Sequence, residues 1–186
     1  MTRKHWQLLF IILAFSGPVL VALAMQTPWF HWEPASTRNH GRLIQPVVPT
    51  GDLALSDLQG QPLSTNSGSN VWTLLKLGEG ACDARCQEQL ELLARVRDLQ
   101  VQRADQLRVV HLDLNNAAAV STDRWIEARA ADPAAWRERL ESQRAVLFLI
   151  DPLGNAMMSY PIDYDPTGVR KDVSVLLRWS KVDAAS

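Results

Sequence analysis

Residues 71–86 read VWTLLKLGEGACDARC and combine an apolar run, a glycine-containing loop and two cysteines. The apolar run ends at Gly78 and is typical of a buried strand. Cys82 and Cys86 follow where a long helix is expected to begin, and residues four apart on a helix lie on one face, ~5–6 Å apart. Because bridged cysteines have Cα atoms ~4.4–6.8 Å apart, this pair can form a disulfide. The stretch predicts a cysteine pair at the junction of a strand and a helix.

The position of the pair favours chemistry over reinforcement. A helix N-terminus presents unpaired N–H groups and a partial positive charge, which stabilise a thiolate; Arg85 adds to this and Asp83 opposes it. Thiolates are the nucleophiles of thiol–disulfide exchange and are soft ligands that suit Cu(I). A passive disulfide is the alternative, but a bridge over so short a loop removes little chain entropy. We predict Cys82 and Cys86 as catalytic residues of a thiol–disulfide oxidoreductase, with Cys82 attacking and Cys86 resolving. The alternatives are a Cu(I)-binding module in which the two thiolates are metal ligands without redox turnover, and a membrane-anchored scaffold in which the disulfide is passive.

The rest of the chain alternates between strand and helix patterns. Apolar residues such as Leu90, Leu93 and Val96 recur at helical spacing after the cysteines. Strands joined by helices indicate an α/β fold, and a late hairpin adds antiparallel pairing, so we expect a thioredoxin-like mixed sheet flanked by helices. The expected strands are 53–55, 71–77, 108–114, 145–150 and 156–160, and the expected helices are 86–106, 123–129, 133–141 and 166–179.

The N-terminal segment predicts export of the domain. A short basic start, residues 2–5, precedes an uncharged and mostly apolar run from Trp6 to Met25, long enough to cross a membrane. The positive flank predicts a cytoplasmic N-terminus, and Trp29, Phe30 and Trp32 fit an aromatic belt at the outer interface. A cleaved signal peptide is the alternative, because residues 22–24 read Ala-Leu-Ala. Both interpretations place the domain outside the cytoplasm.

We therefore expect residues 1–26 to be an N-terminal transmembrane helix or a signal peptide, 27–50 a linker, and 51–182 the thioredoxin-like domain. The retained anchor predicts a single-pass protein of a bacterial-type inner membrane with its C-terminal domain in the periplasm, so that the membrane itself is a partner. The formal net charge of −1, from 19 basic and 20 acidic residues, gives no electrostatic footprint for nucleic acid, which usually needs a clustered basic surface, so we expect no nucleic-acid partner.

With these elements in place, the sequence resembles the Sco/SenC family of copper-binding, thioredoxin-like factors for assembly of the CuA centre of cytochrome c oxidase. The resemblance rests on the N-terminal anchor, the apolar strand, the CxxxC spacing of CDARC (82–86), VVHLDLN (109–115) and AVLFLIDPLGN (145–155). It implies Cu(I) as ligand, and a cytochrome c oxidase subunit or another assembly factor as partner. The CxxxC spacing is the most specific of these features.

One departure concerns the third copper ligand of that family. The family histidine would fall at Gln143, and the proline between the family's cysteines is also absent. His111 is the substitute that the sequence offers, because it lies on a predicted strand beside the cysteine strand and shares a face with Asp113. A histidine packed or hydrogen-bonded at the sheet is the alternative, and Met157 and Met158 are weaker candidates. The predicted metal ligands are therefore Cys82, Cys86 and His111.

Overall fold

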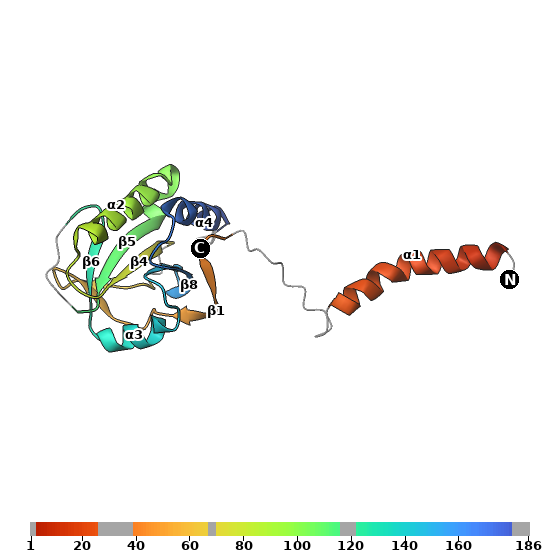
Figure 1. The fold of residues 1–186 in the computed structure, drawn as a ribbon, viewed down its shortest axis with the longest axis horizontal. Helices are drawn as coiled ribbons and strands as arrows, with labels where there is room; N and C mark the ends of the chain where they lie inside the picture. The colour runs from red at the N-terminus through yellow and green to blue at the C-terminus, as the bar shows by residue number, and fades with distance from the viewer. Residues whose placement is uncertain (1–2, 26–38, 67–69, 116–121, 180–186) are drawn as a thin grey trace, which may run out of the picture. The chain divides into compact units, whose positions relative to one another are not determined.

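The computed structural model describes residues 3–25, 39–66, 70–115 and 122–179, in two compact units (Figure 1). The first unit, Met1–Arg38, contains helix α1 (Arg3–Met25), and the second, Asn39–Ser186, contains the sheet and its helices. The first part of the predicted linker, residues 27–38, lies outside the described residues, as does the predicted aromatic belt of Trp29, Phe30 and Trp32.

Helix α1 covers most of the segment predicted as a membrane anchor. Several of its described side chains are large, apolar and exposed, among them Phe10, Leu13 and Phe15. Over the residues that could be searched, no helix has both the length and the apolar character needed to cross a membrane. The transmembrane helix therefore stays a prediction from the sequence.

The second unit is built on one eight-stranded mixed sheet in the order β1-β8-β7-β4-β5-β6-β2-β3, which confirms the predicted sheet type. Strand β4, which leads to the cysteines, pairs in parallel with β5 and antiparallel with β7. Strand β6 pairs in parallel with β5 on its other side. The strands are β1 (Arg42–Pro49), β2 (Leu55–Asp57), β3 (Pro62–Leu63), β4 (Trp72–Gly78), β5 (Leu107–Asp113), β6 (Ile126–Ala130), β7 (Leu147–Ile150) and β8 (Asn155–Tyr160).

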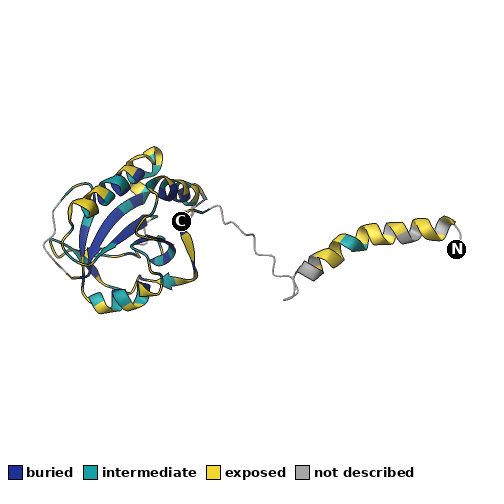
Figure 2. Cartoon of the chain, in the orientation of Figure 1, coloured by how far each residue is buried: buried dark blue, intermediate teal, exposed yellow. Residues whose placement is uncertain are grey.

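Helices cover both faces of the sheet. Helices α2 (Ala84–Asp98) and α4 (Pro166–Trp179) pack on one face, and α3 (Pro133–Glu141) packs on the other. Because side chains alternate along a strand, Leu74 belongs to the core under α2 and α4, and Leu75 to the core under α3. Figure 2 shows buried central strands between helices whose outer sides are exposed.

The predicted helix over 86–106 is wrong beyond Asp98. Helix α2 ends there, and a separate 3-10 helix (Val101–Gln106) leads into β5. The apolar period also fails at this point, because Leu99 and Val101 are exposed. The chain turns back over this stretch so that Leu107 can pair with Trp72 and begin the parallel ladder of β4 and β5.

The predicted helix around 123–129 is also wrong, because Ile126–Ala130 forms strand β6. Alanine, glutamate and arginine favour helices, but intrinsic propensity is a weak determinant beside tertiary context. Here the backbone instead makes its hydrogen bonds to β5 and β2. Glu127 then lies on the α2 side of the sheet and Ala128 on the α3 side.

Part of the predicted linker is a strand. Residues Arg42–Pro49 form β1, which pairs antiparallel with β8 at the edge of the sheet, where its prolines are tolerated. Its start is held by the buried carboxylate of Asp172 in α4. That group accepts hydrogen bonds from the backbone N–H of His40 at 3.0 Å, the backbone N–H of Gly41 at 2.8 Å and the Tyr160 hydroxyl at 3.2 Å. A long-range contact, invisible in local composition, therefore orders this stretch.

Alkaline pH is expected to destabilise the domain through its buried tyrosines. Burial raises the pKa of Tyr164 to about 12, and burial, aided by the charge of Asp172, raises the pKa of Tyr160. The unfolded chain loses these protons near pH 10, whereas the folded chain keeps them, so stability falls as pH rises above about 10. For Tyr164 the slope approaches ~1.4 kcal/mol per pH unit between pH 10 and 12.

The variant Tyr164→Phe should flatten this fall and leave stability near neutral pH little changed, because the Tyr164 hydroxyl is buried without a hydrogen-bond partner among the described residues. Urea unfolding of both proteins from pH 8 to pH 11.5 measures the effect. Parallel curves for the two proteins would show that Tyr164 does not titrate as its burial requires.

Candidate functional site: a disulfide beside a buried histidine

The two cysteines lie where the sequence places them, between the end of β4 and the start of α2. They form a disulfide with a Cα–Cα distance of 5.2 Å, which confirms the predicted proximity. Both residues are partly buried and pack against the core under α2 and α4. The bridge therefore has one side on the core and one side open to solvent, which is a position that a partner thiol can reach.

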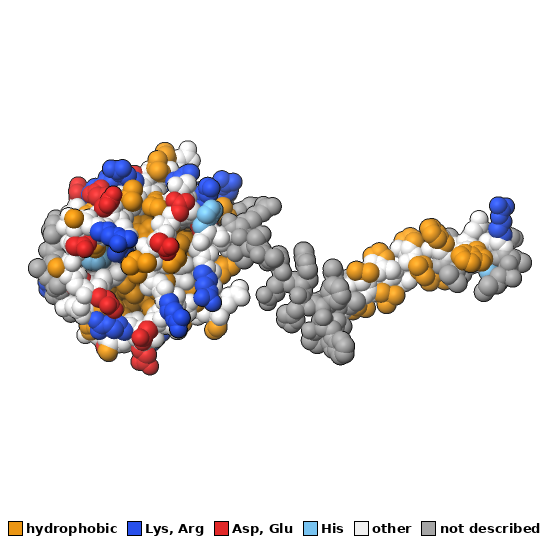
Figure 3. Space-filling view, viewed as in Figure 1, with side chains coloured by type: hydrophobic (Ala, Val, Ile, Leu, Met, Phe, Trp, Pro, Cys, Tyr) orange, Lys and Arg blue, Asp and Glu red, His pale blue; other side chains and the backbone are white. Residues whose placement is uncertain are grey.

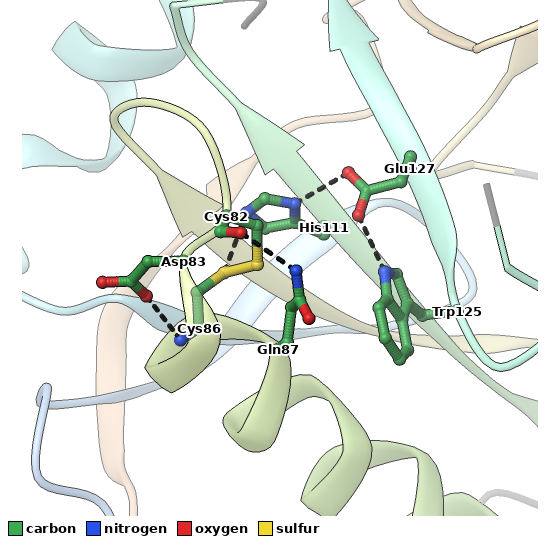
Figure 4. Close-up of a disulfide and its surroundings, with 7 residues drawn as sticks. All are labelled: Cys82, Asp83, Cys86, Gln87, His111, Trp125 and Glu127. Atoms are coloured by element: carbon green, nitrogen blue, oxygen red, sulfur yellow. Dashed lines mark hydrogen bonds and ion pairs between the residues drawn. A yellow bond between two sulfur atoms is a disulfide. The ribbon is translucent and has the colours of Figure 1, made fainter. Parts of the chain in front are cut away.

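Local hydrogen bonds shape the loop that carries the pair (Figure 4). Asp83 caps α2 by accepting a hydrogen bond from the backbone N–H of Cys86 at 2.8 Å. Gln87, one residue further into the helix, donates from Nε2 to the backbone carbonyl of Cys82 at 3.2 Å. The cap satisfies one of the free N–H groups at the helix start and places a carboxylate there.

His111 lies directly under the disulfide. It projects from β5, is 2% exposed, and brings Nε2 to 3.8 Å from Cys86 Sγ. The ligand atoms of Cys82, Cys86 and His111 all lie within 4.8 Å of one another. The predicted contact between His111 and the cysteine site is thus confirmed, whereas its predicted role as a metal ligand stays a prediction.

A buried carboxylate holds the other side of the imidazole. Glu127 on β6 lies 2.8 Å from His111 Nδ1 through Oε2, and its Oε1 accepts a hydrogen bond from the indole N–H of Trp125 at 2.7 Å. Figure 4 shows the resulting chain of contacts, Trp125–Glu127–His111–Cys86. Glu127 and Trp125 were not among the predicted site residues, because their segment was predicted to be a helix. A strand would have placed both side chains on one face by its period of two.

Charged and titratable side chains form a buried row across three neighbouring strands. Lys76 on β4 is in register with His111 on β5, which is in register with Glu127 on β6, and all three are buried. Burial lowers the pKa of Lys76, and the negative charge of Asp83 opposes that shift. Buried ionisable groups are costly unless they are compensated, so a row of them beneath a disulfide makes this place the candidate functional site.

Gly78 makes room for the imidazole. A Cβ atom built at Gly78 would lie 2.6 Å from His111 Nε2, which is far inside contact distance. The glycine that ends the cysteine strand is therefore required by the close approach of the ring.

The other candidates lie elsewhere. Gln143, at the position of the family histidine, follows α3 and donates a hydrogen bond to its neighbour Ser142 at 3.2 Å. Met158 is buried in the core under α2 and α4, and Met157 packs against that core, so the structure supports their reading as packing residues.

The chain matches the model of one known protein family. Residues 72–180, more than half of the chain, match the family described as transmembrane-like, thioredoxin-like, C-terminal domain. The chain belongs to this family. The match begins with β4 and includes both cysteines, His111 and Glu127. No curated protein matches the chain significantly.

Several solved structures with the same fold are Sco or SenC proteins. Yeast Sco1 with copper bound aligns with a TM-score of 0.56 and 13% identity, covering 71% of this chain and 93% of that one. ScoI from Arabidopsis thaliana with copper bound gives 0.53 and 16%, covering 69% and 98%. A SCO1/SenC family lipoprotein from Bacillus anthracis gives 0.52 and 11%, covering 73% and 99%. The thioredoxin-like fold and the Sco-like resemblance are thereby confirmed, with identities low enough to mark this chain as divergent.

Replacing Gly78 with alanine should push the imidazole away from the sulfurs. We expect Gly78→Ala to cost about 1–3 kcal/mol of stability, because it overpacks a filled site. This loss of stability should be largely absent in a His111→Ala background, because the new methyl group then has no imidazole to clash with. Chemical denaturation of wild type, both single variants and the double variant forms a double-mutant cycle. Additive costs would show that the ring and the glycine do not compete for the same space.

Proposed function

We propose that this protein is a thiol–disulfide and copper-handling accessory factor that acts outside the cytoplasm in the assembly of cytochrome c oxidase. The observation that carries the proposal is a solvent-reaching disulfide at a helix start, with a buried histidine 3.8 Å from one of its sulfurs. Cytochrome c oxidase is proposed as the partner because of the resemblance to the Sco/SenC family, two of whose solved structures contain bound copper.

In the reduced state the pair can act on a disulfide of its partner. The Cys82 thiolate attacks one partner sulfur, forms a mixed disulfide and releases the other partner sulfur as a thiolate. The Cys86 thiolate then attacks Cys82 Sγ, which closes the Cys82–Cys86 bridge and releases the first partner sulfur as a second thiolate. The partner gains two electrons, and an external dithiol must supply two electrons to open the bridge again. The expected substrate is the pair of copper-site cysteines of the oxidase subunit, which must be reduced before they bind metal.

Copper handling is the second activity that the site supports. Two thiolates and an imidazole nitrogen are soft and borderline ligands of the kind that Cu(I) prefers, and here they converge within 4.8 Å. Reduction of the bridge would give this set its two thiolates. Bound Cu(I) would be cargo for delivery, and the chain's own part is to present and release it.

Export and membrane attachment belong to the proposal as well. Disulfides persist in oxidising compartments, and the bridge between Cys82 and Cys86 suits the periplasm. The exposed apolar side chains of α1 are of the kind that lipid would cover. Acidic and basic side chains are interspersed on the face of the domain that Figure 3 shows.

Trapping of the mixed disulfide tests the exchange reaction. The variant Cys86→Ser lacks the resolving sulfur, so it should accumulate a covalent complex with the oxidised copper-binding domain of the oxidase subunit. Cys82→Ser should form little of this complex, and the double variant serves as the control. Non-reducing electrophoresis with mass spectrometry measures the product. Equal trapping by both single variants would refute the order of attack, and no trapping with either would refute the exchange activity.

A reporter fusion tests the compartment. Alkaline phosphatase, which is active only after export, should be active when joined after Trp179, and deletion of residues 1–25 should abolish that activity. Retention of the fusion in the membrane fraction after alkaline washing would support an anchor, whereas release would favour cleavage of the segment. An inactive full-length fusion would contradict export.

A further inference from the structure

The hydrogen-bond network around His111 determines which of its ring nitrogens can bind a metal. The indole N–H of Trp125 donates a hydrogen bond to Glu127 Oε1, so the Glu127 side chain acts as a hydrogen-bond acceptor at this oxygen. The other oxygen, Oε2, then accepts the Nδ1–H of His111 at 2.8 Å. With its proton on Nδ1, the neutral imidazole presents the lone pair of Nε2. That atom is the one that faces the sulfurs, 3.8 Å from Cys86 Sγ.

We propose that His111 Nε2 is the third ligand of a Cu(I) site formed with the thiolates of Cys82 and Cys86, and that Glu127 and Trp125 are its positioning residues. This inference rests on the copper-handling part of the proposed function. It assigns to β5 the ligand that the family places where this chain has Gln143.

Burial and packing make this arrangement specific. The side chains of His111 and Glu127 are 2% and 5% exposed, so neither has solvent as an alternative partner. Gly78 leaves no side chain between the ring and the cysteine loop, since any Cβ there would contact Nε2. A carboxylate behind a metal-binding histidine is the usual device for fixing its tautomer and orientation. The imidazole of His111 is therefore held as a rigid, preorganised donor.

The variant Glu127→Gln tests the positioning role with almost no change in shape. Trp125 still requires an acceptor, so the amide oxygen should stay on the indole and the amide NH₂ should face Nδ1. The imidazole proton must then move to Nε2, where it blocks the lone pair. In the double variant Trp125→Phe/Glu127→Gln the amide is free to rotate, present its oxygen to Nδ1–H, and restore the original tautomer.

The experiment uses the full-length chain, reduced under anaerobic conditions in mild detergent. Cu(I) affinity is measured by competition with a chromogenic Cu(I) chelator, coordination by X-ray absorption, and the tautomer by ¹⁵N NMR of the copper-free protein. His111→Ala and Glu127→Gln should each lower the affinity by about 10–100-fold. Glu138→Gln, on the exposed side of α3, is the matched control and should leave the affinity unchanged.

The results separate the inference from the function on which it rests. Three results together would support the inference. Copper in wild type should be bound by two sulfurs and one nitrogen, and Glu127→Gln should show the Nε2–H tautomer with weaker Cu(I) binding. The double variant Trp125→Phe/Glu127→Gln should recover the Cu(I) affinity. Equal affinities of wild type and His111→Ala, with sulfur-only coordination, would overturn it while leaving copper binding by the cysteines intact. No Cu(I) binding by wild type would overturn both. Thermal unfolding of each variant shows that any loss occurs in a folded protein.

Discussion

The parallel pairing of β4 with β5 is the constraint on which the site depends. It sets Lys76 beside His111 and Gly78 beside Asp113, so the cysteine strand ends next to the histidine strand. Helix α2 begins after β4 and brings Cys86 Sγ to 3.8 Å from His111 Nε2. A shift of one residue in this register would turn His111 to the opposite face of the sheet, under α3. The core under α2 and α4 prevents such a shift, because it buries alternate residues of both strands.

The polar row beneath the disulfide is a costly feature of an otherwise apolar core. Desolvating a carboxylate and an ammonium group costs free energy, and a hydrogen-bonded pair such as His111 and Glu127 often only offsets that cost. Leucines of similar volume would serve a purely structural sheet at least as well. The row is better understood through its position next to the sulfurs, since it places an imidazole nitrogen 3.8 Å from Cys86 Sγ and buried ionisable groups on both sides of that imidazole.

The comparison with Sco/SenC structures shows a shared thioredoxin-like fold. The cysteine loop occupies the start of the first long helix after β4, as the CxxxC resemblance implies. In this chain the histidine beside the cysteines comes from β5, a central strand of the sheet. Lys76 on β4 and Glu127 on β6 lie in register with it on either side. The imidazole is therefore held in a fixed position beneath the disulfide.

The sequence by itself determined the elements with strong local signals. The apolar strand before the cysteines, their position at a helix start, the cap of α3 at Asp132 and the apolar face of α4 all follow from short-range patterns. His111 was within reach of this reasoning because strand order and period place it beside the cysteine strand. Only the tertiary structure decided that residues 126–130 form β6 and that residues 42–49 form β1, because both strands depend on partners far away in the chain. Glu127 and Trp125 were hidden for the same reason: their helix-favouring neighbourhood is overruled by hydrogen bonds to β5 and β2, which no local pattern records.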